Sequence, residues 1–500
     1  HNFRERTTND QFSKINDLVI PGLYNLGNTS GPPEADNTYQ KRRLFGVYTD
    51  INLAFKDYLF LGLTGRNDWS STLPVSNRSF FYPSANLSFV FSEAFQMPKW
   101  ISYGKVRASA ARVGNDANPY LLQSNFVPGV VADGYNNSQL TFPFNGIPGF
   151  TVGATIGNPN LTPEFTTSYE GGVEASFLNN RLGIDFTYYH NKTTDQIITL
   201  PIAASTGYTF RVTNIGQVSN RGVELLLRGI PVRTKDFTWE STVTFSKNKS
   251  NVDAIAPGTS SITLPGGFNG GTVVAQVGKP YGQFFGSGFL RDSLGRVVVN
   301  EATGYPVTDP QARTYGTYLP DYIASLFNSF SYKGFTLTLL FDGRKGGLFF
   351  SRTKSLQTFV GTDPKTLYND REPFVIPNSA VLDPGSGKYI ANTIPVESAQ
   401  DYWTNFVSNN AIENLLDASF IKLREATLSY RIPKQWLNKV KFISGMQIGL
   451  VGRNLWLKTP KENTYSDPET SSFGTGNAQG YEYGSVPSVR SFGANLRIVF

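Results

Sequence analysis

The sequence contains no cysteine among its 500 residues and has only two histidines, His1 and His190. The absence of thiols excludes a disulfide framework, thiolate zinc sites and a cysteine nucleophile, and it leaves the cellular compartment open. Two histidines provide almost no material for a histidine-based catalytic triad or zinc site. The G-x-S-x-G and H-E-x-x-H motifs are missing as well. We therefore predict that the chain is not an enzyme and has no catalytic residues, metal ligands or cofactor.

Long apolar runs and runs of one charge are also absent. No stretch of about 18 or more apolar residues occurs, so the sequence predicts no transmembrane helix. The first residues, HNFRERTTNDQF, lack the charged-then-apolar layout of a signal peptide, and an exported protein would carry that signal in a preceding part. The 45 Lys and Arg residues are scattered among 38 Asp and Glu residues, so nucleic-acid binding is not predicted.

Aromatic residues and glycine are abundant. Phe, Tyr and Trp make up 14% of the chain, whereas charged residues make up 17% against a typical share of about a quarter. Aromatic residues favour strands, and the 48 Gly and 29 Pro residues supply turns. The mean hydropathy of −0.25 is polar because alternate strand residues face water. The composition predicts an all-β fold with one polar and one apolar strand face.

Alternation of apolar and polar residues recurs through nearly the whole chain and supports this fold class. Residues 182–189 are an example, where Leu182, Ile184, Phe186 and Tyr188 oppose Gly183, Asp185, Thr187 and Tyr189. Glu170 and Glu174 lie in the polar phase of the preceding segment, which suggests a wet interior. Alternation by itself fits both a soluble sandwich and a membrane barrel.

The lengths of strands and links favour the barrel. Many alternating segments run about ten residues, which a tilted strand needs to cross hydrocarbon. Short links at 55–58, 178–181, 234–236 and 332–334 alternate with long segments rich in Gly, Pro, Asn and Ser at 113–166, 250–320, 343–416 and 457–487. Short periplasmic turns and long extracellular loops are typical of outer-membrane barrels. Residues 44–500 then hold about 13 strands, with Phe500 at the periplasmic end, and residues 1–40 read as the tail of a preceding loop.

The last segment, SFGANLRIVF, places five residues in one apolar phase and ends the chain on an aromatic residue. Such a terminal strand resembles the signal read by the outer-membrane barrel assembly machinery. We predict that Phe492, Leu496, Ile498 and Phe500 carry this signal, with Ala494 in the same phase.

Aromatic residues in the loops are the candidates for substrate binding, because their rings stack on sugars or pack against peptides. The candidates are Trp69, Tyr402, Trp403 and Tyr481. An interfacial aromatic girdle or loop packing is the alternative explanation for each of them. Two oxygen-rich segments, 115–118 and 465–469, leave a structural calcium ion possible, although neither has EF-hand spacing.

Several strings resemble one known family when they are taken together in order. They are GRNDWSSTLP at 65–74, FFYPSANLSFVFSE at 80–93, NPNLTPE at 158–164 with the hairpin that follows it, SNRGVELLLRG at 219–229, SYKGFTLTLLFDGRKGG at 331–347, FIKLREATLSYRIP at 420–433, VGRNLWLKTP with YSDPE, and the closing SFGANLRIVF. Together they span residues 44–500 and resemble the barrel of SusC/RagA-type TonB-dependent transporters.

The resemblance implies a transmembrane antiparallel β-barrel of about 22 strands, of which residues 1–500 supply roughly the last 13–14. It implies active uptake of oligosaccharides or oligopeptides across the outer membrane of a Bacteroidota-type cell. The implied partners are a SusD-like surface lipoprotein, the TonB–ExbB–ExbD complex, outer-membrane lipids and the barrel assembly machinery, with dimers of transporter–lipoprotein pairs possible. The sequence contains no signal, TonB box or plug domain.

Two other functions fit the same alternation. One is a barrel that works without TonB, such as a passive porin or an adhesin. The other is a soluble carbohydrate-binding β protein, which solubility without detergent would reveal.

Overall fold

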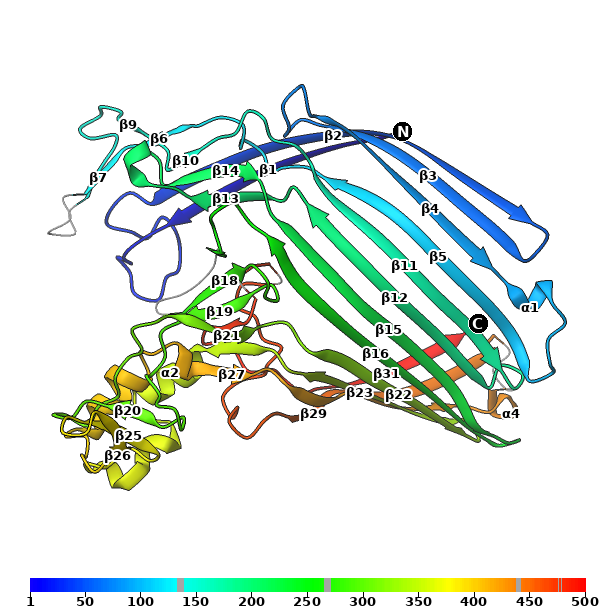
Figure 1. Cartoon of the computed structure of the whole chain (residues 1–500). Helices are drawn as coiled ribbons and strands as arrows, with labels where there is room; N and C mark the ends of the chain where they lie inside the picture. The colour runs from blue at the N-terminus through cyan, green and yellow to red at the C-terminus, as the bar shows by residue number, and fades with distance from the viewer. Residues whose placement is uncertain (133–138, 265–270, 438–441, 475, 478) are drawn as a thin grey trace. The chain divides into compact units, whose positions relative to one another are not determined.

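The chain forms one large antiparallel sheet with several small sheets and short helices in its long links (Figure 1). The computed structural model describes residues 1–500 except 133–138, 265–270, 438–441, 475 and 478. The prediction of an all-β fold is confirmed. The large sheet has 14 strands, in the order β1-β2-β3-β4-β5-β11-β12-β15-β16-β22-β23-β28-β29-β31. Their bounds are β1 Asn2–Lys14, β2 Glu34–Phe55, β3 Leu59–Ser70, β4 Ser79–Phe89, β5 Ile101–Asn115, β11 Glu164–Phe177, β12 Leu182–Thr194, β15 Gln217–Arg233, β16 Phe237–Ala254, β22 Tyr322–Tyr332, β23 Phe335–Lys345, β28 Phe420–Arg431, β29 Gly445–Lys458 and β31 Ser491–Val499.

The strand β1 contradicts the prediction that residues 1–40 are the tail of a loop. β1 pairs along its whole length with the first part of β2, from Asn2↔Gly46 to Lys14↔Glu34. The 22 residues of β2 measure about 70 Å at roughly 3.3 Å per residue, more than twice the thickness of the hydrocarbon layer. The half of β2 that pairs with β1 therefore needs no apolar face. Without apolar alternation, the sequence gives no sign of these strands.

The predicted tight turns are all present. They join β2 to β3, β11 to β12, β15 to β16 and β22 to β23. Left-handed residues close three of them, namely Lys56, the run Leu178–Asn180, and Lys333 with Gly334. The links 90–100 and 432–444 instead contain the short helices α1 Phe91–Ala94 and α4 Lys434–Leu437.

The long links fold into small modules. Their sheets have the strand orders β10-β14-β13, β17-β18-β19-β21, β20-β25-β26, β27-β24-β30, β6-β9 and β7-β8. These strands are β6 Phe126–Pro128, β7 Val130–Ala132, β8 Gln139–Thr141, β9 Phe150–Val152, β10 Thr155–Ile156, β13 Ile197–Pro201, β14 Phe210–Asn214, β17 Ser261–Thr263, β18 Thr272–Gln276, β19 Gln283–Gly286, β20 Val297–Val299, β21 Arg313–Thr317, β24 Leu348–Ser351, β25 Ser379–Asp383, β26 Lys388–Ala391, β27 Leu415–Asp417 and β30 Tyr481–Glu482. The helical segments are α2 Arg352–Phe359, α3 Ala399–Asp401, the 3-10 turns η1 Ala204–Thr206, η2 Pro364–Arg371 and η4 Ile412–Asn414, and the π-helical η3 Tyr402–Val407. Across the described residues, no helix has the length and apolar character needed to span a membrane.

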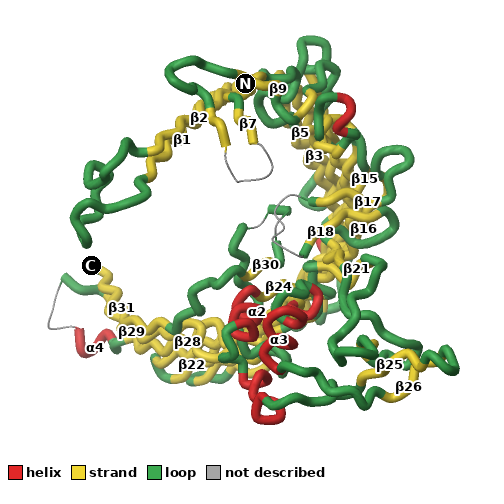
Figure 2. Tube along the Cα trace, turned by 90° about the vertical axis from the view of Figure 1, so that its left-hand side faces the viewer, coloured by secondary structure: helices red, strands yellow, loops and turns green. Residues whose placement is uncertain are grey.

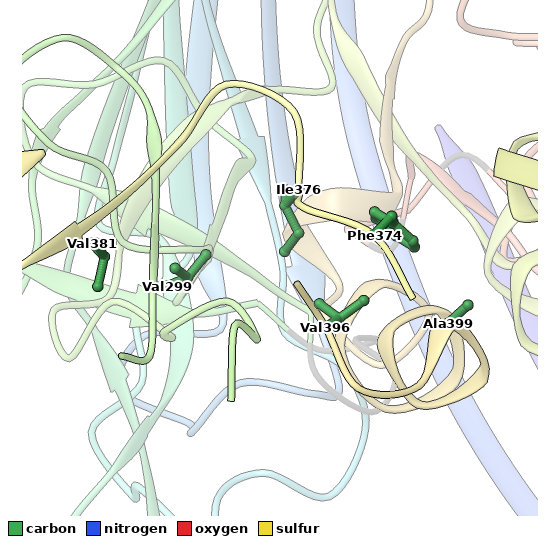
Figure 3. Close-up of a cluster of buried hydrophobic side chains, with 6 residues drawn as sticks. All are labelled: Val299, Phe374, Ile376, Val381, Val396 and Ala399. Carbon is green, nitrogen blue, oxygen red and sulfur yellow. The ribbon is translucent and has the colours of Figure 1, made fainter. Parts of the chain in front are cut away.

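The chain divides into two compact units. Unit 1 comprises residues 1–88, 108–169 and 191–217, and unit 2 comprises residues 89–107, 170–190 and 218–500. Each unit has small apolar cores within its loops. One core of unit 1 contains Leu73, Phe80, Ala117, Leu161 and Val212, and one core of unit 2 contains Val299, Phe374, Ile376, Val381, Val396 and Ala399 (Figure 3).

The register of unit 2 aligns apolar residues in rows across the strands. Paired residues point to the same face, so each row is read directly from the pairing. One row near the short turns is Phe237–Tyr332–Phe335–Tyr430–Ile448–Leu496, and the next is Trp239–Phe330–Leu337–Leu428–Leu450–Ala494. The first row is mostly aromatic, as expected for a membrane interface. Over these two rows the strands of unit 2 have a continuous apolar face, and the residues between them form a polar face.

Candidate functional site on the polar face and in the loops

In unit 1, the polar face carries an ion pair seated over a glycine. Arg66 Nε donates to Asp68 Oδ1 at 2.8 Å, and the hydroxyl of Tyr82 donates to Asp68 Oδ2 at 2.5 Å. Gly46 lies opposite Asp68 in the ladder, and a Cβ there would come within 2.3 Å of Asp68 Oδ1. Glycine is therefore required at position 46 so that the pair can lie flat on the strand.

A second cluster of unit 1 surrounds Asp116, which lies in the segment considered for calcium. Arg42 binds its carboxylate through two nitrogens, with Nε 3.0 Å from Oδ2. Thr72 Oγ1 donates to the same Oδ2 at 3.1 Å, and Ser70 donates to it as well. The side chain of Asp116 is 1% exposed. Its charge is thus already balanced by an arginine.

In unit 2, cross-strand ion pairs line the polar face of β5, β11 and β12. Lys105 Nζ lies 2.5 Å from Glu174, and Arg107 Nη2 lies 2.5 Å from Asp185. Arg107 also donates to Thr187 Oγ1 at 2.6 Å. Glu174 and Asp185, which alternation placed in the polar phase, are therefore paired with bases of β5, the strand next to β11 and the second from β12.

The densest charge cluster joins β28 to the loop 459–490. Lys422, whose side chain is 4% exposed, lies 2.6 Å from Asp467 and also contacts Glu469. Arg424 binds Glu469 through both terminal nitrogens at 2.8 Å and contacts Asp342 of β23. Burial raises the pKa of Glu469, but hydrogen bonds from Arg424 and Lys422 outweigh it and lower the pKa below its usual value. The carboxylate stays charged and fastens the loop to the strand.

A β-bulge gives Arg424 its position. On both neighbouring strands the register skips Arg424, passing from Leu423 to Glu425. The extra residue places Arg424 and Glu425 on the same polar face. Asn454, opposite on β29, has a φ of 52°, which accommodates the bend. The sequence prediction missed this cluster, although the break of strict alternation at KLRE was a signal for it.

A buried carboxylate holds two long loops of unit 2 together. Glu482 of β30 is 0% exposed, and it accepts hydrogen bonds from Ser351 Oγ and Thr353 Oγ1 at 2.8 Å. It also accepts from the backbone nitrogens of Thr353 and Ser485 at 3.1 and 2.8 Å. The donor Thr353 lies in the first turn of α2, where the helix dipole favours a negative charge. Figure 2 shows β24, β30 and α2 close together.

Within unit 2, the candidates Tyr402 and Trp403 pack on one set of residues and the candidate Tyr481 packs on another. Tyr402 and Trp403 are half-buried neighbours in η3, with ring centroids 4.7 Å apart, and both pack against the core around Phe374. Burial raises the pKa of Tyr402 to about 12. Tyr481 is 1% exposed, packs on Phe284, Phe350 and Phe473, and donates its hydroxyl hydrogen to the carbonyl of Gly271 at 3.2 Å.

Trp69 belongs to unit 1 and lies at the loop end of β3. Its ring packs against that of Phe45, with the two ring centroids 5.5 Å apart. Loop packing therefore accounts for the contacts of Tyr402, Trp403 and Tyr481, and cross-strand packing accounts for those of Trp69. A role of these rings in substrate binding stays a prediction.

The residues of the predicted assembly signal share one face of β31. Phe492, Ala494, Leu496 and Ile498 pair with Gly452, Leu450, Ile448 and Met446, in the apolar phase of β29. The ring of Phe500 stacks on that of Phe442, with the ring centroids 6.2 Å apart. The carbonyl oxygen of Phe500 accepts a hydrogen bond from Ser444 Oγ at 3.2 Å. The chain therefore ends beside the link 432–444. Recognition of this segment by an assembly machinery stays a prediction.

The arrangement is that of a two-faced strand sheet with folded loops rather than a catalytic centre. In unit 2, one strand face is apolar and the other carries paired charges, and the loop modules are fixed by buried polar contacts. The described residues include no group of three or more His, Cys, Asp or Glu side chains placed to hold a metal ion. At the segments considered for calcium, Asp116 and Asp467 bind Arg42 and Lys422 respectively.

Comparison with known proteins identifies the family to which this chain belongs. The family model for the TonB dependent receptor-like β-barrel matches residues 3–455. The chain therefore belongs to the TonB-dependent receptor β-barrel family, as the resemblance of its strings to SusC/RagA-type transporters implied.

Two curated relatives show how much of a longer protein this chain matches. The chain is 29% identical to TonB-dependent receptor P26 of Formosa agariphila over 530 residues, which cover 99% of this chain and 50% of that protein. It is 24% identical to TonB-dependent receptor SusC of Bacteroides thetaiotaomicron, covering 79% of this chain and 38% of SusC. The chain thus spans about half the length, or less, of the curated relatives that it matches.

Solved structures share the fold. The RagAB peptide transporter matches with a TM-score of 0.72 at 18% identity, covering 99% of this chain and 55% of that chain. The RagAB peptide importer in the open-open state matches with a TM-score of 0.70 at 19% identity. At these identities the likeness concerns the fold alone.

Proposed function

We propose that this chain is the C-terminal barrel part of a TonB-dependent importer that takes up oligosaccharides or oligopeptides across the outer membrane. The observation that carries the proposal is the two-faced sheet of unit 2. Its apolar rows run unbroken across β16, β22, β23, β28, β29 and β31, which suits contact with lipid. Its opposite face is charged, paired and connected to the loops.

In the proposed mechanism, the loops capture substrate together with a SusD-like lipoprotein, which forms a lid. A plug in the remaining part of the longer protein fills the lumen, and the TonB–ExbB–ExbD complex remodels that plug to admit the substrate. Membership of the family and the greater length of the relatives support this division of labour. Oligopeptide and oligosaccharide substrates are both retained, and the importer is expected to form pairs of transporter–lipoprotein units.

The first test is purification of the intact protein in detergent from the outer membrane of its host. We expect a polypeptide about twice as long as this chain, with a SusD-like lipoprotein in the same complex. A protein that lacks a plug, or one that dissolves without detergent, would contradict the proposal.

The second test separates active import from passive diffusion. Uptake of labelled oligosaccharides and oligopeptides is measured in host cells with and without an uncoupler of the inner-membrane proton gradient. An energised importer loses uptake on uncoupling, whereas a porin continues to admit the solute. A strain lacking the gene is the control for uptake by other routes.

A further inference from the structure

The apolar face of unit 2 has a hollow at the end where the strands enter the long loops. Its floor consists of Ala324 of β22 and Gly343 of β23, which are paired neighbours in the ladder. The row beside them contains the larger side chains Leu326 and Phe341, which are also paired and line the same groove. Two small residues flanked by large ones leave a groove of about 630 Å³ in an otherwise regular face.

Two lysines form the outer rim of this groove. Lys345 is the last residue of β23 and pairs with Tyr322, while Lys458 is the last residue of β29 and pairs with Ile421. Both lie in the phase of the apolar rows, because Gly343 pairs with Ile421 and precedes Lys345 by two residues. Both are exposed, and neither amine has an ion-pair partner within the described ranges. Lys345 thus borders the apolar trough on its loop side, and Lys458, in the row of Ala324 and Gly343, borders it on the side of β29.

We propose that this groove binds one acyl chain of an anionic outer-leaflet lipid, whose phosphate group lies between Lys345 and Lys458. The inference rests on the outer-membrane location in the proposed function. The trough matches the hydrocarbon chain in polarity, and the two amines match a phosphate in charge. The groove lies where β23 and β29 pass into the loops 346–419 and 459–490, the end assigned to the cell exterior. The bound lipid would therefore support the base of the loop cluster held by Lys422 and Arg424.

Gly343 allows a test that fills the groove without disturbing the backbone. A Cβ at this position would meet the carbonyl oxygen of Phe420 at 3.5 Å and that of Ala324 at 3.7 Å, which are ordinary contacts. The variant Gly343→Leu therefore occupies the trough, and Ala426→Leu on the same face, outside the groove, is its control. The double variant Lys345→Gln/Lys458→Gln removes the rim charge, and Lys333→Gln at a short turn is the charge control.

The experiment is native mass spectrometry of the full-length transporter in detergent, titrated with phosphatidylglycerol or phosphatidylcholine of identical acyl chains. We expect the wild-type protein to prefer phosphatidylglycerol. The rim variant should weaken phosphatidylglycerol binding about thirtyfold and leave phosphatidylcholine binding unchanged, since it removes two lysines and each lysine near a charged head group contributes about 1 kcal/mol. Gly343→Leu should weaken both lipids, and neither control should change either.

Equal binding of the two lipids by the wild-type protein would overturn the proposal, as would equal losses in the rim variant and Lys333→Gln. Recovery of a lipoprotein acyl chain from the groove would overturn it too. Heat-modifiable migration on gels shows whether each variant is folded. Rim variants with Arg at both positions should restore the preference if the first pair proves unfolded. Uptake is measured separately, so a loss of the proposed import function would leave the lipid result readable.

Discussion

In unit 2, the surroundings of a side chain are determined locally in the strands and by distant segments in the loops that connect them. In the strands, the surroundings of a side chain follow from its phase, as in the row that joins Trp239, Phe330 and Leu337. In the loops, burial arises between segments far apart in the chain, as between Ser351 and Glu482, which are 131 residues apart. In the proposed function the strand face contacts lipid, whereas each loop core is closed by protein. The comparison implies that equal substitutions have unequal costs in the two regions.

The largest difference is expected for truncation of an apolar side chain. Phe349 is 1% exposed and packs with Leu416 and Ala418, so Phe349→Ala leaves a cavity and lowers the free energy of unfolding by about 4 kcal/mol. Leu337→Ala lies on the apolar row that contacts lipid in the proposed function, so it loses transfer energy without a cavity, about 1.5 kcal/mol. Urea unfolding in lipid vesicles measures both. Equal losses would show that the strand face is packed like a protein core.

Removal of a buried carboxylate tests the loops alone. Glu482→Ala leaves four donors without an acceptor and should lower the local stability of the loop cluster by about 3 kcal/mol, with the strands unaffected. Hydrogen exchange of residues 352–359 reports this opening. Glu301→Ala, at an exposed loop position, is the control and should leave that exchange unchanged.

The pH dependence of the same loops provides a third contrast. Burial lowers the pKa of Lys354 from 10.5 to about 8, and its amine donates to the carbonyl of Glu413. Between about pH 8 and pH 10.5, Lys354 is protonated in the unfolded chain and deprotonated in the folded loop. The stability of the loop therefore rises with pH over this range, by on the order of 3 kcal/mol. Hydrogen exchange corrected for its intrinsic pH dependence measures the slope. Lys354→Met should remove it, and a slope that persists would assign it to another group.

The smallest effect is expected for a polar contact on the apolar face. Trp239 Nε1 donates to Asn328 Oδ1 at 3.0 Å on the apolar face of the strands. Trp239→Phe leaves the amide of Asn328 unpaired and should cost about 1 kcal/mol in vesicle unfolding. The double variant with Asn328→Leu should recover most of that loss. If it recovers nothing, the ring area of Trp239 matters more than its hydrogen bond.

The same contrast explains what the sequence could predict. Strands such as β12 and β31, and the tight turns between them, follow from alternation and local turn chemistry, and these predictions were confirmed. β1 was missed because a polar ribbon has no apolar phase. The contacts of Glu482 were missed because no local pattern connects β30 with α2.

Local rules also failed for the buried aromatic residues. Nothing near Tyr481 in the sequence distinguishes a ring that faces a ligand from one that closes a core against Phe284 and Phe350. The ion pairs of Lys422 and Arg424 with the loop 459–490 are likewise set by folding rather than by spacing.

The bulge at Arg424 affects β28 as a single inserted base affects a reading frame. Before it, Ile421 and Leu423 face the apolar side, and after it Ala426 and Leu428 do so, because one residue is skipped. The side chains of such a strand alternate between its two faces with a period of two residues. Insertion or deletion of an odd number of residues therefore moves every later side chain to the opposite face. Chains of this kind can therefore vary freely in the lengths of their loops, while their strands change by pairs of residues or at a bulge that absorbs the remainder.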